Sequence, residues 1–414
     1  MGWSSVTRHC WLHPPVPATS LGAAARGMLA LLTAVALVAR TPTADAQAAI
    51  ETSGPASCAA ATSDPELRGV VTLLERLAAT PPVWDGYAPA QEPVLLALDT
   101  ARFAGAPLTA ACVLVWHAQA PLRVVELSAH PGLSTSLYGF LNIEPDGPRA
   151  QAGAVATMVS SRRITSEDEA RLRAAGATRA VVIPVPLDLG TLGSLGEALR
   201  RSGTDPALIQ AEMVVHEGFH LHVQFPAWLD QARRVHAWPD WDLQPDRREM
   251  RERCYAGSPA IATAFDAELG ALLAAFDALY GAEAARDAHA ARAAAQRFIE
   301  LRTSRYALLD TTTVRQGDRR IGCALAETHL ELEEGTAQWV GHATLLHAGV
   351  RSMTTLRGSY GTAQPDAFYR TGPLQLWILD ALLGRDAVHA LTARLARAAS
   401  PDTGLHHEFA RLLR

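Results

Sequence analysis

The sequence of 414 residues lacks the signatures of several common protein classes. Its five cysteines form no CxxC spacing, which argues against thiolate metal sites and dithiol redox chemistry. No GxSxG motif occurs, so a serine nucleophile on a sharp turn is not indicated. The net charge is only -5, which gives no general attraction for nucleic acid or anionic membranes. With no repeats or long low-complexity linkers, the chain is expected to be globular.

An export signal is expected over residues 1–46. Residues 28–39 form an apolar run that is too short to span a bilayer, and a small-x-small cleavage site ends at Ala46. Met28 is an alternative start. No cysteine follows the run where a lipoprotein anchor requires one. The prediction is a secreted or periplasmic protein without stable membrane insertion after cleavage.

Cleavage would remove one cysteine, Cys10, and leave four. An oxidising compartment favours two disulfides among these four, and three pairings are open. Four buried free thiols are the alternative. The remaining cysteines are Cys58, Cys112, Cys254 and Cys323.

The pattern of apolar residues predicts an α+β protein with the sheet in its N-terminal part. Residues 47–65 are small and polar and indicate a flexible N-terminus, followed by a sheet-containing subdomain at 66–203 and a helical subdomain at 204–414. Strands are expected at 93–98, 111–116, 123–127, 154–159 and 180–185. Helices are expected at 66–79, 166–175, 206–224, 259–280, 283–308, 322–348, 372–396 and the C-terminus.

Residues 216–220 form an HExxH motif. Histidines four residues apart lie on one face of a helix, so His216 and His220 can bind a single ion. Glu217 points beside them and can take the proton of a water molecule on the metal. The surrounding helix is apolar except for a stripe of Glu212, His216, His220 and Gln224, which indicates a buried helix whose polar residues need partners.

A catalytic zinc needs a third protein ligand, and Glu334 in Glu334-Gly335-Thr336-Ala337 is the best candidate. The two motifs together resemble the gluzincin metallopeptidases, which carry HExxH on one helix and a ligand glutamate on a second. In the aminopeptidase-like branch this glutamate lies in an N-E-G-x-A-like motif. The resemblance implies a zincin-like helical part that binds one Zn²⁺. Small residues after the glutamate are expected to let the second helix approach the zinc helix.

Two features depart from these families and leave rival ligands open. Glu333 stands in the place of the family's asparagine, and the two motifs are farther apart, with Ala-rich helices between them that suggest an inserted hairpin. Glu249 and Glu252 lie nearer the family spacing, but in a charge run that is typical of a solvated surface. Glu327 and Glu331 share the helix face of Glu334 and are weak candidates to accept hydrogen bonds from a ligand imidazole, with plain surface charge as the alternative.

Tyr369 is the best candidate to donate a hydrogen bond to the developing oxyanion, because its order along the chain resembles that of the tyrosine in the aminopeptidase-like branch. Tyr360 and Tyr306 compete for this role, and Arg370 is a candidate contact for a substrate carboxylate. The other helical histidines are not expected to be ligands: His222, His236, His329, His342 and His347.

The sequence therefore predicts a zinc hydrolase whose partner is a peptide or protein substrate. Zinc would be held by His216, His220 and Glu334, with Glu217 as base, and a strand at 153–160 would pair with an extended peptide. A zinc hydrolase of non-peptide amides or esters and a non-catalytic secreted binding protein are the alternatives.

Overall fold

The structure is a computed structural model of the whole chain. It describes residues 58, 64–89, 92–98, 110–118, 120–128, 139–142, 165–185, 187, 197, 199–200, 204–224, 245–281, 286–361, 366–396 and 404–413. All of these belong to the second of two units into which the chain divides, Met1–Gln47 and Ala48–Arg414. The predicted signal at 1–46, most of the segment at 47–65 and the predicted strand at 153–160 lie outside the described residues.

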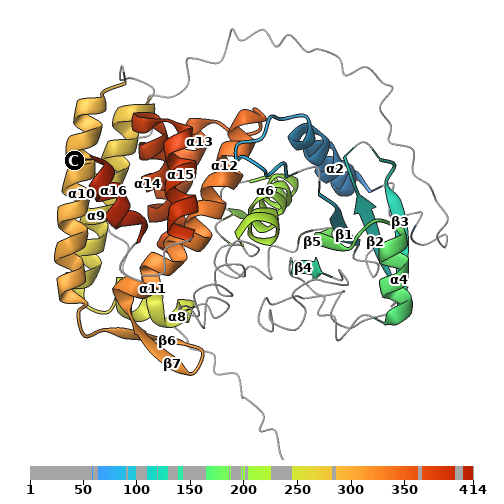
Figure 1. Cartoon of the computed structure of the whole chain (residues 1–414), viewed down its shortest axis with the longest axis horizontal. Helices are drawn as coiled ribbons and strands as arrows, with labels where there is room; N and C mark the ends of the chain where they lie inside the picture. Colours follow the sequence, from blue (N-terminus) through green and yellow to red (C-terminus); the bar gives the residue numbers. More distant parts are fainter. Residues whose placement is uncertain are drawn as a thin grey trace, which may run out of the picture. The chain divides into compact units, whose positions relative to one another are not determined.

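A five-stranded sheet forms the N-terminal part, with strand order β3-β2-β1-β5-β4 (Figure 1). Strand β1 pairs antiparallel with β2 and parallel with β5, so the predicted α+β class with a mixed sheet is confirmed. The short edge strand β4 was not predicted from the sequence. The strands are β1 (Val94–Leu98), β2 (Ala110–Trp116), β3 (Arg123–Ser128), β4 (Gly139–Asn142) and β5 (Arg179–Val185).

Both faces of the sheet are buried. Leu96 and Ile183 point into the main core with helices α2 (Pro65–Ala78) and α6 (Pro206–Phe219), whereas Leu95 and Val182 pack with α4 (Ser166–Ala174). Side chains of a strand alternate between faces, so burial of both faces requires apolar residues at every position. This requirement explains why the strands appear in the sequence as continuous apolar runs.

Helix α6 joins the sheet to the helical part. Asp205 accepts a hydrogen bond from the backbone N–H of Ala207 at 2.9 Å and caps the helix, and Pro206 occupies its first position, as predicted. Gln210 donates to the carbonyl of Pro184 in β5 at 2.6 Å. Helix α6 packs on α2 and β5 and also on α12 (Thr336–His347) (Figure 1).

The remaining helices form the C-terminal part. Helices α9 (Pro259–Tyr280) and α10 (Ala288–Leu308) lie between the two motifs and pack against each other as a long hairpin (Figure 1). A two-stranded hairpin, β6 (Thr313–Gln316) and β7 (Arg319–Gly322), leads into α11. The other helices are α8 (Arg247–Glu249), α9 (Pro259–Tyr280), α10 (Ala288–Leu308), α11 (Cys323–Leu330), α13 (Met353–Gly361), α14 (Phe368–Leu383), α15 (Arg385–Ala396) and α16 (Leu405–Leu413).

Two long helices predicted from the sequence are divided in the structure. The one expected at 322–348 contains a π-helical segment, η3 (Glu331–Gly335), between α11 and α12. The one expected at 372–396 begins earlier, at Phe368, and breaks at Gly384, whose φ of 88° belongs to the left-handed region. Further π-helical segments are η1 (His220–Gln224), which continues α6, and η2 (Met250–Tyr255), which continues α8.

Helix α9 is long and apolar enough to cross a membrane by length and composition alone. In the structure it packs on α10 and contributes Phe265, Leu272 and Phe276 to the core. It also buries Glu268 in ion pairs with two arginines. Helix α9 therefore contributes both apolar side chains and a paired carboxylate to the interior of the helical part.

Two disulfides join the described cysteines. Cys58 pairs with Cys112 of β2, and Cys254 of η2 pairs with Cys323 at the start of α11. The alternative of four free thiols is therefore wrong, because all four cysteines are paired. The second disulfide ties the segment after α8 to the helix that leads to Glu334.

Candidate metal centre

Three buried side chains from two helices converge on one point. His216 lies in the last turn of α6, His220 is the first residue of η1, and Glu334 lies in η3. Their side chains form the potential metal-binding group among the described residues, and all three are buried. Two of the three ligands thus belong to π-helical segments, which interrupt α-helices frequently at functional sites.

The distances within this group are close to those expected around one tetrahedral ion. Nε2 of His216 lies 3.1 Å from Nε2 of His220 and 3.2 Å from Oε2 of Glu334, and the third edge, from His220 to Glu334, is 3.6 Å. Ligand atoms about 2.0–2.2 Å from a tetrahedral zinc lie about 3.3–3.6 Å apart. The three predicted ligands are therefore close enough together to hold one metal ion.

Each oxygen of Glu334 has its own neighbours. Oε2 faces the two imidazoles and accepts a hydrogen bond from the hydroxyl of Tyr369 at 2.7 Å. Oε1 accepts one from Nη2 of Arg247 at 2.5 Å, and Nη1 of the same guanidinium donates to the oxygen of Tyr369 at 3.1 Å. The predicted ligand and the predicted oxyanion donor are thus in contact, and an arginine contacts both.

Charges within the group shift the pKa values of two of its members. Burial opposes a rise in the pKa of His220, but the hydrogen bond and charge of Glu334 outweigh it and raise the pKa to about 9. Burial likewise opposes a fall in the pKa of Glu334, but Arg247 and the two histidines hold it well below its usual value. A proton and a metal ion compete for the same lone pair on His220.

Glu217 lies beside the cluster and is 8% exposed. Burial raises the pKa of its carboxyl group, while the charges of His216 and His220 act in the opposite direction. Gly218, the next residue, packs against Tyr87, whose hydroxyl donates to the carbonyl of Val215 at 2.8 Å and would lie 2.4 Å from a Cβ at position 218. A side chain at this position of the HExxH motif would therefore displace the hydroxyl of Tyr87.

The charge run at 247–253 has two faces. Glu252 pairs with Arg248 on the surface, and Glu249 binds Arg320 at 2.9 Å and the backbone N–H of Arg315 at 3.1 Å. Neither rival ligand belongs to the metal-binding group. Sequence reasoning took the run for a solvated surface and missed Arg247, whose guanidinium contacts Glu334 and Tyr369.

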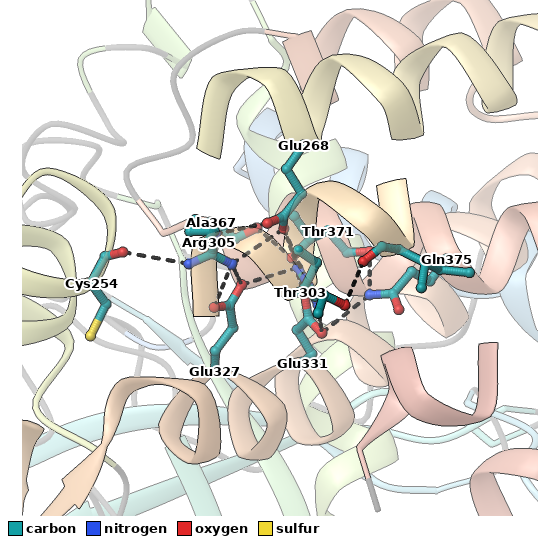
Figure 2. A network of polar contacts seen from close by, with 11 residues as sticks. Cys254, Glu268, Thr303, Arg305, Glu327, Glu331, Ala367, Thr371 and Gln375 are labelled. Atoms are coloured by element: carbon teal, nitrogen blue, oxygen red, sulfur yellow. Dashed lines mark hydrogen bonds and ion pairs between the residues drawn. The ribbon is translucent and has the colours of Figure 1, made fainter. Parts of the chain in front are cut away.

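Glu327 and Glu331 are not partners of a ligand imidazole, contrary to expectation, and they are not surface charges either. Both are fully buried on the side of the helix that faces α10 and α14. Figure 2 shows Arg305 between Glu268 and Glu327, with Glu331 turned toward Thr371 and Gln375. The π-helical segment changes the angular register between residues 331 and 334, so i+3 spacing no longer places them on one face.

The other candidate residues have separate roles. The hydroxyl of Tyr360 accepts a hydrogen bond from Trp377 at 2.9 Å. Arg370 donates a hydrogen bond to the backbone carbonyl of Tyr360. Both side chains are thus bonded to residues outside the metal-binding group. Tyr306 is packed among the arginines of the buried network. Of the five histidines set aside, four have contacts elsewhere: His222 with Glu92, His329 with Glu333, His342 with Glu212 and His347 with Arg385. His236 lies outside the described residues.

The small residues after Glu334 bring together a different pair of helices from the one expected. A Cβ at Gly335 would lie 2.8 Å from the Cα of Gly372, so this glycine allows close contact between η3 and α14. Gly341 of α12 faces Glu212 and His216 of α6 at ordinary distances. The close contact of η3 with α14 is what places Tyr369 against Glu334.

Comparison with known proteins found no matching family model, no matching curated protein and no matching solved structure.

Proposed function

We propose that this protein is a zinc-dependent hydrolase. The observation that carries the proposal is the triangle of His216, His220 and Glu334, whose edges of 3.1–3.6 Å suit one tetrahedral ion. Its donor set of two imidazoles and one carboxylate is typical of catalytic zinc, which leaves one coordination position open. When bound, zinc lowers the pKa of water to about 7 and polarises a carbonyl group.

Within this class, we propose a peptidase that cleaves amide bonds. Glu217 is the base that takes the proton of the attacking water and passes it to the leaving nitrogen, as its place beside His216 favours. The O–H of Tyr369 donates to Oε2 of Glu334 in the structure; once Oε2 binds the ion, this O–H becomes available as a donor for the negative charge that develops on the carbonyl oxygen. Arg247 donates to the oxygen of Tyr369 and so polarises that O–H, which makes it a stronger donor.

Export fits this proposal. Cys58–Cys112 and Cys254–Cys323 are the kind of bonds that persist in an oxidising compartment. Together with the apolar run before Ala46, they support a secreted or periplasmic enzyme that meets peptides or proteins outside the cytoplasm.

The metal content of the purified mature protein tests the site. We expect about one zinc per chain, retained in a Glu249→Ala/Glu252→Ala double variant and lost in Glu334→Ala. The double variant is the matched control, because it removes two carboxylates without touching the cluster. Wild-type protein that neither contains nor takes up zinc would end the proposal.

Substrate class is tested next, with a peptide library beside a panel of esters and non-peptide amides. Peptide turnover that chelation abolishes and zinc restores is the expected result. Turnover of esters alone would replace the peptidase by the broader hydrolase. No turnover of any substrate by zinc-loaded protein would favour a binding protein.

A further inference from the structure

The side chain of Gln224 contacts the surroundings of two metal ligands at once. Its Oε1 lies 2.5 Å from Nδ1 of His220, one turn earlier in the same helix. Its Nε2 donates to the backbone carbonyls of Glu333 at 3.0 Å and Leu332 at 3.3 Å. Gln224 is buried, so these contacts are sheltered from water.

The chemistry of the contacts settles which atom of the amide faces which partner. Carbonyl oxygens only accept hydrogen bonds, so the NH₂ group of Gln224 must face the two carbonyls. Its oxygen then faces His220 and accepts from Nδ1–H. A neutral imidazole with its proton on Nδ1 carries its lone pair on Nε2, which is the atom that points at His216 and Glu334.

The two carbonyls belong to η3, directly before the third ligand. A π-helical segment has a wider turn than an α-helix and is held less firmly by its own backbone. Donation from Gln224 to residues 332 and 333 therefore fixes the position from which Glu334 projects. One amide thus orients the imidazole of His220 and anchors the segment that carries Glu334.

We propose that Gln224 is a positioning residue that sets the geometry between the two halves of the metal site. It does not touch the metal or the substrate. Its effect is to hold His220 in the ligating tautomer while fixing η3 at the distance that the triangle requires. The proposal rests on the proposed zinc site, and it extends the functional motif from HExxH to HExxHxxxQ in this chain.

The test compares zinc affinity, measured by competition with a chromophoric chelator, across wild type and three variants. Gln224→Met keeps the length of the side chain but neither hydrogen-bonding function, and zinc affinity should fall about 10–100-fold. Gln224→Glu keeps the acceptor for His220 but loses the donor to η3, so its affinity should lie between those of wild type and Gln224→Met. Gln210→Leu is the matched control, because it removes a buried amide from the same helix that binds only the carbonyl of Pro184.

The control should lose stability but bind zinc like wild type. The visible spectrum of the Co²⁺-loaded protein gives a second readout, and it should change in Gln224→Met but not in Gln210→Leu. Wild-type affinity and spectrum in Gln224→Met would overturn the proposal, as would equal losses in both variants. Failure of the zinc site itself is distinguishable, because wild-type protein would then bind no zinc at all.

Discussion

The two oxygens of the Glu334 carboxylate have different partners. Oε2 faces the histidines and the hydroxyl of Tyr369, while Oε1 is held by Arg247. A carboxylate anchored at one oxygen ligates through the other, so Arg247 favours a single bond to the ion and leaves room for water and substrate. The arginine also adds a positive charge at the edge of the site, where the proposed hydrolysis would develop negative charge.

The role of Glu217 predicts a separation of binding from catalysis. Glu217→Gln removes the base but keeps the size of the side chain, so kcat should fall by about 10²–10⁴. Zinc content should not change, because Glu217 is not a ligand. Glu252→Gln on the surface is the control, and a Glu217→Gln protein that is as active as wild type would exclude Glu217 as the base.

A second prediction concerns the hydroxyl of Tyr369. Tyr369→Phe retains the packing of the ring against Phe368 but removes the proposed donor, so kcat should fall about 10²–10³-fold with little change in KM. Tyr360→Phe is the matched control: it removes a buried hydroxyl bonded to Trp377, so it should lower stability and leave kcat near that of wild type. Equal activity of the two variants would contradict the assignment of Tyr369.

At the level of the elements, the site depends on the contact between η3 and α14. Gly335 and Gly372 pack backbone against backbone, and Glu331 of η3 accepts hydrogen bonds from Thr371 and Gln375 of α14. These contacts fix the register in which Tyr369 meets Glu334. One candidate metal ligand, Glu334, and the proposed oxyanion donor, Tyr369, are therefore positioned by the same helix pair.

This arrangement predicts that Gly372→Ala is harmful although it adds only one methyl group. The new Cβ would lie 2.7 Å from the Cα of Gly335 and 3.0 Å from the carbonyl of Glu331, so backbone must move. A loss of about 1–3 kcal/mol in stability and a weaker affinity for zinc are expected. Gly270→Ala on α9 is the control, since no atom lies within 4 Å of its Cβ and alanine favours the helix. Thermal unfolding and chelator competition measure both effects.

Local features of the site could be predicted from the sequence, and long-range ones could not. The spacing of His216 and His220 follows from helix geometry, and Asp205 and Pro206 mark where that helix begins. Glu334 was favoured over Glu249 because its motif resembles that of the gluzincin metallopeptidases. Local periodicity alone does not distinguish the two glutamates. Arg247 was missed because its inward direction depends on a three-residue helix and on the tertiary contact with α14.

The π-helical segments explain most of the remaining differences. Periodicity of 3.6 residues placed Glu327 and Glu331 on the face of Glu334, but the wider turn at η3 changes this register, and both residues instead bind arginines of α10. No pattern in the sequence marks such a segment. The sheet was easier to predict, because strands buried on both faces are short and apolar throughout, whereas the edge strand β4 carries too few residues for a pattern.

For the whole molecule, buried charges join helices that are distant in sequence. Arg302 and Arg305 of α10 bind Glu268 of α9, Glu327 of α11 and Glu331 of η3, all with at most 1% exposure. Such a network stabilises only when it is complete, since removal of one partner leaves a buried charge unpaired. It fixes the α9–α10 hairpin on the side of η3 opposite the metal site, which makes the hairpin part of the scaffold.

A second network predicts how stability depends on pH. Burial opposes a low pKa for Glu212, but Arg351 and His342 outweigh it and hold the pKa below its usual value of 4.5. A lowered pKa stabilises the folded state above about pH 4.5, and this contribution is lost as the pH falls toward the folded pKa. Glu212→Gln should lose about 3 kcal/mol at pH 7, with the difference from wild type shrinking below pH 4.5. Urea unfolding at several pH values measures this, and a difference that does not vary with pH would contradict it.

The most direct measurement of the central claim is anomalous diffraction at the zinc edge from crystals of the zinc-loaded protein. One peak is predicted, bonded to Nε2 of His216, Nε2 of His220 and Oε2 of Glu334 at about 2.0–2.2 Å, with a fourth position open to solvent. A peak elsewhere, or a site closed by a fourth protein ligand, would contradict the assignment of a catalytic zinc.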